Sequence, residues 1–214
     1  MKKFKVLVCA FVIVIYNMAA INSKNQSNSI DNPVINLYAP SFLNTDYSIT
    51  SDSISITQQD DSSEYYTLYD SLVNEVKTYI KTYNKNAQDI IAESIVKHGL
   101  KNNIDICFML SQAKIETCFG KAGIGRPTSR KSLFGVERRK YKTYDECVES
   151  YVSVLKKYYL VKGKTEQHLL KKYVSKSGHR YAQNPNYERD LQKTYNHIKR
   201  KTDISTIQQS INNL

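Results

Sequence analysis

From about residue 64 onward, the chain places apolar side chains at steps of three and four residues, the spacing of helices with a buried face. Gly, Pro, Asn and Ser interrupt these runs and mark the turns between them. The spacing predicts helices over six segments: 65–82, 86–98, 104–118, 144–159, 165–175 and 186–201. Gly99 is expected to end the second helix. Because strand-like alternation is scarce, we expect an all-α domain of roughly six helices joined by short loops.

The N-terminal stretch has the pattern of a secretory signal peptide. Three lysines precede an apolar run from Val6 to about Ile15, and two alanines follow the run. The run is shorter than the ~20 residues of a membrane span, although an uncleaved anchor reaching Ile21 is the alternative. We therefore expect residues 1–21 to be a signal peptide, no integral membrane domain after its cleavage, and a secreted or periplasmic protein.

The next segment differs in composition from the helical part. Residues 22–63 are dominated by Ser, Asn, Asp, Gln and Thr, and such a segment buries too little apolar surface to offset its ordering entropy. We expect a flexible polar linker there. With 214 residues, of which 41% are apolar, the chain can bury one core of ordinary size. The sequence places that core in residues 64–201 and leaves residues 202–214 as a C-terminal tail.

The folded part is strongly basic. Residues 63–214 hold 27 Lys and Arg against 15 Asp and Glu, a net charge of +12, and a field of that sign attracts polyanions. Outside the cytoplasm these are cell-wall polymers and lipid headgroups. A nucleic acid is the cytoplasmic counterpart, but a secretory signal and the lack of a nucleic-acid-binding motif argue against it. We expect a monomer with an anionic cell-wall surface as partner, and a well-solvated surface without a specific partner is the alternative.

Cysteine and histidine positions give little support for a metal site or a disulfide. Three cysteines follow the signal, namely Cys107, Cys118 and Cys147. The first two share one expected helix, where eleven residues separate them by about 16 Å, beyond the ~7 Å limit for a disulfide. Only a pair with Cys147 is possible, and small buried apolar residues are the simpler interpretation. Neither C-x-x-C nor H-E-x-x-H occurs, and the four histidines are scattered, so we predict no metal and no cofactor.

Glu116 stands near the end of the segment 104–118, beside the face that should pack inward. On a helix it lies within about 20° of Met109, about 40° of Gln112 and about 60° of Ala113. Burial beside apolar side chains disfavours the charged carboxylate, so its pKa rises and it can hold a proton near neutral pH, as a general acid must. The alternative is a boundary glutamate that reaches solvent or pairs with a neighbouring lysine or arginine.

Four elements, in order, resemble the glucosaminidases of glycoside hydrolase family 73, which belong to the lysozyme-like superfamily. SQAKIETCFG (111–120) and SLFGV (132–136) resemble the family's A-Q-A-x-x-E-S-x-W-G and N-L-F-G-I elements. YKTYDECVESYVSVLKKYY (141–159) resembles its aromatic-x-x-Tyr, Glu-Ser helix, and YAQNPNYERDL (181–191) resembles its late Tyr-Ala-x-x-Pro-x-Tyr element. The lead-in NAQDIIAESIVKHGLKNNID is also similar, so the resemblance covers about residues 85–200.

The resemblance implies a lysozyme-like helical fold whose small β-lobe is nearly absent. It also implies an endo-β-N-acetylglucosaminidase that hydrolyses the β-1,4 bond after N-acetylglucosamine in the glycan strands of peptidoglycan. By position Glu116 matches the catalytic acid, and Gly120 matches the glycine at the helix end. Phe119 replaces the family's tryptophan, and we expect it to keep an aromatic wall for the sugar.

The second catalytic group is less well marked. Hydrolysis needs a second carboxylate about 5 Å away as nucleophile, one about 6.5–9.5 Å away to activate water, or the substrate's own N-acetyl group. Members of the family carry a second glutamate in a lobe after the L-F-G element, where this chain has only VERRK (136–140). Glu137 is the only carboxylate there, and pairing with Arg138 or Arg139 is its alternative role. Glu149 matches the Glu-Ser pair and is expected to be structural.

The same resemblance suggests further site residues. Tyr181 matches a tyrosine that faces the cleft, where a phenol could hydrogen-bond the 2-acetamido group or the developing charge. Gln112, Phe134, Gly135 and Tyr187 are assigned to substrate binding, with the glycine letting the backbone approach the sugar. Packing in the core is the alternative role for both tyrosines, because the chain has seventeen of them.

Other functions remain open at this point. Without a second carboxylate, substrate assistance or a lytic transglycosylase reaction becomes the alternative, and a muramidase can be built on the same fold. A non-catalytic module that binds or assembles peptidoglycan is suggested by the missing lobe and the replaced tryptophan. A basic nucleic-acid-binding protein has the charge in its favour and the signal peptide against it.

Overall fold

The computed structural model describes residues 61–135 and 140–214. Within these ranges the secondary structure is helical, and no strand occurs in either of them. The elements are α1 (Asp61–Tyr83), α2 (Ile90–Lys101), α3 (Ile106–Thr117), η1 (Gly123–Gly125), α4 (Tyr144–Val154), η2 (Leu155–Tyr159), α5 (Glu166–Lys171), α6 (Tyr187–Lys201) and α7 (Ile204–Asn212). The prediction of an all-α fold is confirmed, and the arrangement is consistent with a lysozyme-like helical domain.

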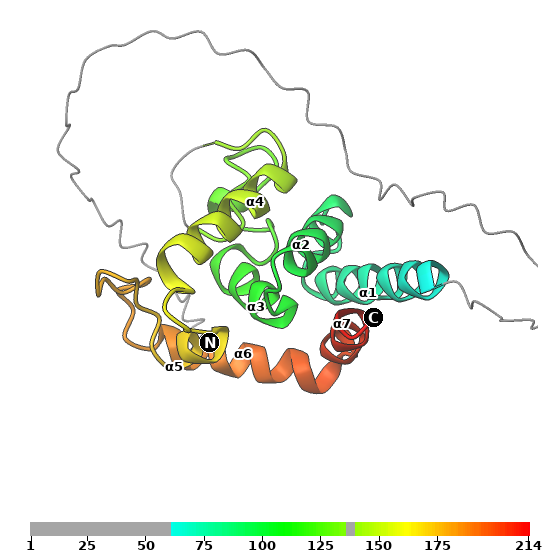
Figure 1. The fold of residues 1–214 in the computed structure, drawn as a ribbon. Helices are drawn as coiled ribbons and strands as arrows, with labels where there is room; N and C mark the ends of the chain where they lie inside the picture. The colour runs from blue at the N-terminus through cyan, green and yellow to red at the C-terminus, as the bar shows by residue number, and fades with distance from the viewer. Residues whose placement is uncertain (1–60, 136–139) are drawn as a thin grey trace, which may run out of the picture. The chain divides into compact units, whose positions relative to one another are not determined.

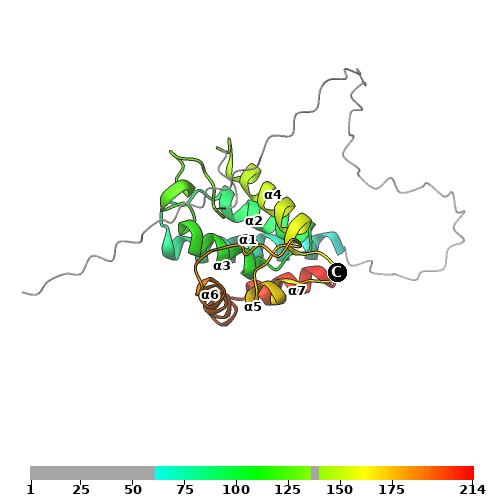
Figure 2. The ribbon, with the colours of Figure 1, turned by 90° about the vertical axis from the view of Figure 1, so that its left-hand side faces the viewer.

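Helix α3 lies at the centre of the domain, with α6 along one side and α2 and α4 on the other (Figures 1 and 2). Every residue from Ile106 to Gln112 is 0% exposed, so the helix is buried all round and not only on one face. Its first turn is capped by Asp105, whose side chain accepts hydrogen bonds from the backbone N–H groups of Cys107 and Phe108. The helix that carries Glu116 is therefore both capped at its start and enclosed by the core from Ile106 to Gln112.

The predicted helix boundaries hold within a few residues, except around Gly99. That glycine lies inside α2 and does not end it. A Cβ at position 99 would come within 2.7 Å of Cγ1 of Ile106 at the start of α3, so the glycine allows the two helices to approach closely. The helix continues to Lys101, and the chain then turns at Asn103, which adopts a positive φ of 50°.

Two of the expected helices are shorter than their apolar patterns suggest. Regular helix in α4 ends at Val154, and the π-helical turn η2 follows it. Helix α5 ends at Lys171, because Lys172 turns to an extended conformation and Val174 forms an isolated antiparallel bridge with Arg180. The segment between α5 and α6 is thus held in a loop close to α3, which matters for the site described below.

The C-terminal segment 202–214, expected to be a tail, instead contains helix α7 and forms part of the core. Ile204, Gln208 and Ile211 are buried there, and α7 packs against α1 and α3. Gln208 also bridges the start of α3, donating to the Ile104 carbonyl and accepting from the Ile106 N–H. The sequence analysis overlooked a short amphipathic helix of nine residues.

Several expectations concern groups outside the helices. The expected signal peptide and nearly all of the expected linker lie outside the described residues, and α1 begins within the last residues of that linker. Across 61–135 and 140–214, no helix has both the length and the apolar character to cross a bilayer. In the same ranges no cluster of three metal-binding side chains occurs, and the three cysteines are free thiols.

Candidate active site

Glu116 lies in the last turn of α3, at the point where three other segments converge. Its side chain is half-buried. The hydroxyl of Tyr187, the first residue of α6, donates a hydrogen bond of 2.7 Å to Oε1 of Glu116. Because Tyr187 is itself 6% exposed, this contact is largely shielded from solvent and occupies one of the two carboxyl oxygens.

The surroundings of Glu116 favour its protonated form. Burial raises the pKa of the carboxyl, while the hydrogen bond from Tyr187 and the nearby phenol of Tyr181 oppose that rise, and the net direction is upward. The phenols cannot replace the carboxyl as acids, because burial raises the pKa of Tyr181 and of Tyr187 well above the usual range of tyrosine. Glu116 is therefore able to hold and donate a proton in this site.

Gly135 lies directly against the free oxygen of Glu116. A Cβ at position 135 would stand 2.6 Å from Oε2 and 3.2 Å from Cδ of the carboxyl group, and the glycine has a φ of +67°. No other residue type fits both the space and the backbone conformation. Gly135 is itself exposed to solvent.

The segment that carries Gly135 is tied to the end of α3 by hydrogen bonds from buried groups. The hydroxyl of Thr117 donates to the carbonyl oxygen of Leu133 over 2.9 Å, and the hydroxyl of Tyr181 donates to the carbonyl oxygen of Phe134. The backbone N–H of Leu133 reaches Sγ of Cys147 on α4 at 3.3 Å. These contacts hold the Leu-Phe-Gly element at a fixed distance from Glu116.

The chain leaves α3 through three consecutive residues with left-handed backbone conformation. The φ angles are 50° at Cys118, 55° at Phe119 and 80° at Gly120. A Cβ on Gly120 would lie 3.0 Å from both the carbonyl oxygen of Gly125 and the hydroxyl of Tyr144, which are themselves joined by a hydrogen bond of 2.8 Å. Cys118 and Phe119 adopt a conformation that costs non-glycine residues energy, so the surrounding packing has to stabilise this turn.

A cluster of tyrosines lies beneath the carboxyl group. Gln112, one turn before Glu116, accepts hydrogen bonds at Oε1 from the hydroxyls of Tyr151 (2.7 Å) and Tyr173 (3.0 Å). The Tyr173 ring packs against that of Tyr181 with 4.4 Å between centroids. The sequence analysis missed the roles of Tyr151 and Tyr173. The signal for Tyr151 was its position seven residues after Tyr144 on the buried face of α4, which predicts burial but not its partner.

The structure corrects the expected roles of the two phenylalanines. Phe119 is 0% exposed and packs edge-on against Tyr79 with 5.9 Å between ring centroids. Phe134 is 1% exposed and stacks on Tyr151 at 3.7 Å. Both rings belong to the hydrophobic core, because the left-handed turn and the Thr117 contact direct them inward. Phe134 serves the site through its backbone carbonyl, and the expected aromatic wall for a sugar is not supplied by Phe119.

The remaining predicted residues fall into three groups. Glu116, Gly135, Tyr181 and Tyr187 come together as expected, although Tyr187 is nearly buried and uses its hydroxyl to contact Glu116. Gln112 is fully buried, so its predicted contact with substrate is replaced by support of the tyrosine cluster. Glu137 lies outside the described residues, and its role stays a prediction.

A second half-buried carboxyl group, that of Glu166, offers a comparison with Glu116. Burial raises its pKa, as it does for Glu116. However, Glu166 accepts a hydrogen bond from the backbone N–H of Asp105 at 3.3 Å, beside the start of α3, where helix ends favour negative charge. Within residues 61–135 and 140–214, Glu116 instead accepts from the Tyr187 hydroxyl and lies against Gly135, so the two carboxyl groups differ in their surroundings.

Comparison with known proteins agrees with this geometry. A model of the glucosaminidase family, described as mannosyl-glycoprotein endo-beta-N-acetylglucosaminidase, matches residues 92–200. The protein belongs to this glucosaminidase family. The match begins in α2 and ends in α6, and it therefore includes Glu116, Gly135, Tyr181 and Tyr187. Searches of the curated proteins and of the solved structures found no significant match to this glucosaminidase.

Membership in the family indicates the class of reaction and the class of substrate of this glucosaminidase. It supports a glycoside hydrolase that acts on peptidoglycan, and hence action outside the cytoplasm on the glycan of the cell wall. The assignment of the acid and the choice of bond depend on the geometry at Glu116.

Proposed function

We propose that the protein is an endo-β-N-acetylglucosaminidase that hydrolyses the β-1,4 bond after N-acetylglucosamine in peptidoglycan, with Glu116 as general acid. The observation that carries the proposal is the setting of this carboxyl group. Burial raises its pKa, Tyr187 holds its Oε1, and its Oε2 lies beside exposed Gly135. A carboxyl group that is protonated and open on one side can give its proton to a glycosidic oxygen.

In the proposed reaction, the sugar chain passes over Gly135, which has no side chain of its own. Glu116 donates the proton from Oε2 to the oxygen that leaves the anomeric carbon, so that bond breaks as the leaving sugar becomes an alcohol. Tyr187 then stabilises the carboxylate by its hydrogen bond to Oε1, because a donor to the charged form favours ionisation. Tyr181 positions the Leu-Phe-Gly element through the Phe134 carbonyl.

The second step needs a group that activates water or attacks the anomeric carbon. We propose Glu137 for this role, as the only carboxylate in the 136–140 segment. The substrate's own N-acetyl group is the alternative, and Glu137→Gln separates the two. A loss of activity comparable to that of Glu116→Gln supports Glu137, while near wild-type activity assigns the step to the substrate.

The test of Glu116 is a zymogram of purified cell walls. We expect Glu116→Gln to lower the rate of wall cleavage by about 10²–10⁴-fold, the usual contribution of a general acid, and to leave sedimentation with insoluble peptidoglycan unchanged. Glu149→Gln is the matched control, because Glu149 is an exposed carboxylate on α4, and it should cleave like wild type. Equal clearing by Glu116→Gln and wild type would refute the role of Glu116, and a wild type that binds walls without clearing them would indicate a binding module.

The cellular location belongs to the same proposal. Residues 1–21 have the pattern of a signal peptide, and an enzyme of this class meets its substrate only outside the cytoplasm. We propose that the mature protein is secreted or periplasmic and acts as a monomer on the anionic cell wall.

A further inference from the structure

Helix α6 presents a row of cationic side chains on its outward surface. At 100° per residue, Arg189, Lys193 and Arg200 lie within about 40° of one another around the helix, and eleven residues at ~1.5 Å spread them over about 16 Å. Asn196 lies in the same row. All four residues are exposed, so the row forms a narrow cationic strip along the helix, here called the α6 strip.

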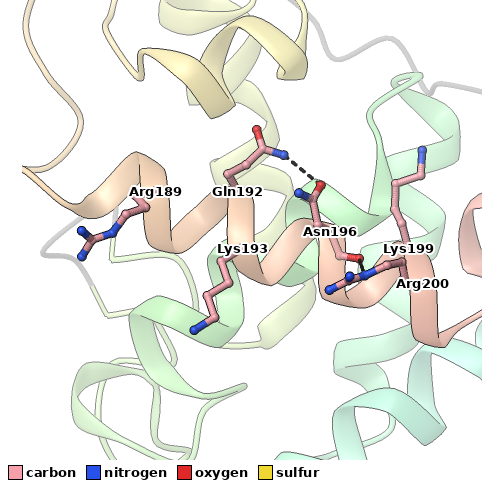
Figure 3. A pocket seen from close by; sticks show the side chains of 6 residues that line it. All are labelled: Arg189, Gln192, Lys193, Asn196, Lys199 and Arg200. Atoms are coloured by element: carbon pink, nitrogen blue, oxygen red, sulfur yellow. Dashed lines mark hydrogen bonds between the residues drawn. The ribbon is translucent and has the colours of Figure 1, made fainter.

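The strip borders two shallow hollows. The first, about 520 Å³, is lined by Arg189, Gln192, Lys193, Asn196, Lys199 and Arg200. Figure 3 shows Arg189 and Lys193 projecting to one side of α6, with Gln192 and Lys199 on the other. The second hollow, about 320 Å³, shares Lys193 and adds Lys114 and His197. Lys114 lies two residues before Glu116 on α3, so the cationic surface continues from α6 towards the active-site end of the domain.

The charges of the strip are largely uncompensated. Within the described part of the chain, Lys193, Lys199 and Arg200 have no acidic group within 4.0 Å, and Arg189 has only Asp190, at 3.7 Å and exposed. An exposed pair of that kind contributes little. Asp190 also lines the second hollow. Asn196 of the strip is instead bonded to its neighbours on α6. Gln192 donates to Asn196 Oδ1 (2.9 Å) and Arg200 donates to the Asn196 carbonyl (3.2 Å), as Figure 3 shows.

We propose that the α6 strip binds a wall polymer whose repeating units carry phosphodiester groups. This inference rests on the proposed function, because it requires the protein to act at the cell wall. A single row of cations over about 16 Å matches a linear chain with a negative charge at each repeat, and arginine and lysine are the side chains that bind phosphate oxygens. Such binding would hold the enzyme on its substrate surface, with Glu116 at one end of α3 and the strip beside it.

The test compares two triple variants of the full chain that lose the same charge. The strip variant carries Arg189→Gln, Lys193→Gln and Arg200→Gln. The control variant carries Lys85→Gln, Lys171→Gln and Lys172→Gln, which replace three exposed lysines outside α6. Each protein is sedimented with purified walls before and after hydrofluoric acid has removed the phosphodiester-linked polymers. We expect the strip variant to bind intact walls at least about tenfold more weakly than the control variant, with a shallower dependence on salt, and we expect binding by wild type to fall after stripping.

The outcomes separate this proposal from the proposed function. Equal binding by the two triple variants would overturn it. Wild-type binding that survives stripping would mean that the strip binds carboxylates of the peptidoglycan itself. A strip variant that lost only its binding to anionic phospholipid vesicles would mean that the strip binds a lipid surface. Either result would overturn the proposal. Because Glu116 is untouched, the strip variant should cleave stripped walls like wild type, and Glu116→Gln should bind intact walls like wild type. A failure of Glu116→Gln to lose activity would leave the binding result standing.

Discussion

Gly135→Ala tests the proposed contact between the Leu-Phe-Gly element and the catalytic acid. The added Cβ would stand 2.6 Å from Oε2 of Glu116, about 0.8 Å short of the 3.4 Å at which ordinary contact begins, so the carboxyl group or the loop has to move by nearly 1 Å. A misplacement of that size costs about 10²-fold in rate. The φ of +67° adds a backbone cost of about 1–2 kcal/mol to folding. We expect kcat/KM to fall about 10²-fold and the free energy of unfolding to fall by about 1–2 kcal/mol.

The matched control is Gly163→Ala. Gly163 has a similar φ of +76°, and a Cβ there meets nothing within 4 Å. It should therefore lose a similar free energy of unfolding and keep nearly wild-type activity. Urea unfolding measures the first quantity, and initial rates of release of reducing ends from purified glycan strands measure the second. If Gly135→Ala lost no more activity than Gly163→Ala, the proposed placement of Glu116 against Gly135 would be wrong.

Three further predictions follow from the contacts around Glu116. Tyr187→Phe removes the hydrogen-bond donor to Oε1 of Glu116, so the pKa of Glu116 should rise further. The alkaline limb of the pH profile of kcat/KM should then move to higher pH, and an unchanged limb would contradict the proposed role of Glu116 as general acid. Glu116→Gln should gain stability relative to wild type as the pH rises above about 4, because the raised pKa of Glu116 makes folded wild type lose stability on deprotonation. Urea titrations at about pH 4 and about pH 7 measure this gain, and no gain would be seen if the carboxyl were not buried. Gln112→Leu leaves the hydroxyls of Tyr151 and Tyr173 without their acceptor and should cost about 2 kcal/mol or more of stability in thermal or urea unfolding, while a smaller loss would mean that the two phenols pair with each other.

The sequence predicts the helices and the position of Glu116 well, because both depend on local patterns. Apolar spacing locates α1 to α6 within a few residues, and the helical angle places Glu116 beside the buried face of α3. The ordered Leu-Phe-Gly and Tyr-Ala elements bring Gly135 and Tyr181 to the same carboxyl group. These are the features that a motif describes directly.

Other features depend on contacts between distant segments, which spacing does not encode. Gly99 has the appearance of a helix end, but its role is set by Ile106, seven residues later in the next helix. Phe119 and Phe134 were expected at the surface of the site, and their burial follows from the left-handed turn and from the Thr117 contact. The pairing of Gln112 with Tyr151 and Tyr173 joins residues 39 and 61 positions apart. Helix α7 was missed because three buried residues in a short polar segment give a weak pattern.

The muropeptides released from purified peptidoglycan test the central claim most directly. Mass spectrometry of the products of wild type should show N-acetylglucosamine at the new reducing ends, and Glu116→Gln should release almost none of these products. Reducing-end N-acetylmuramic acid would indicate a muramidase, and anhydro-muramic ends would indicate a lytic transglycosylase. Either product, or an undiminished yield from Glu116→Gln, would contradict the assignment of Glu116 as the acid of an endo-β-N-acetylglucosaminidase.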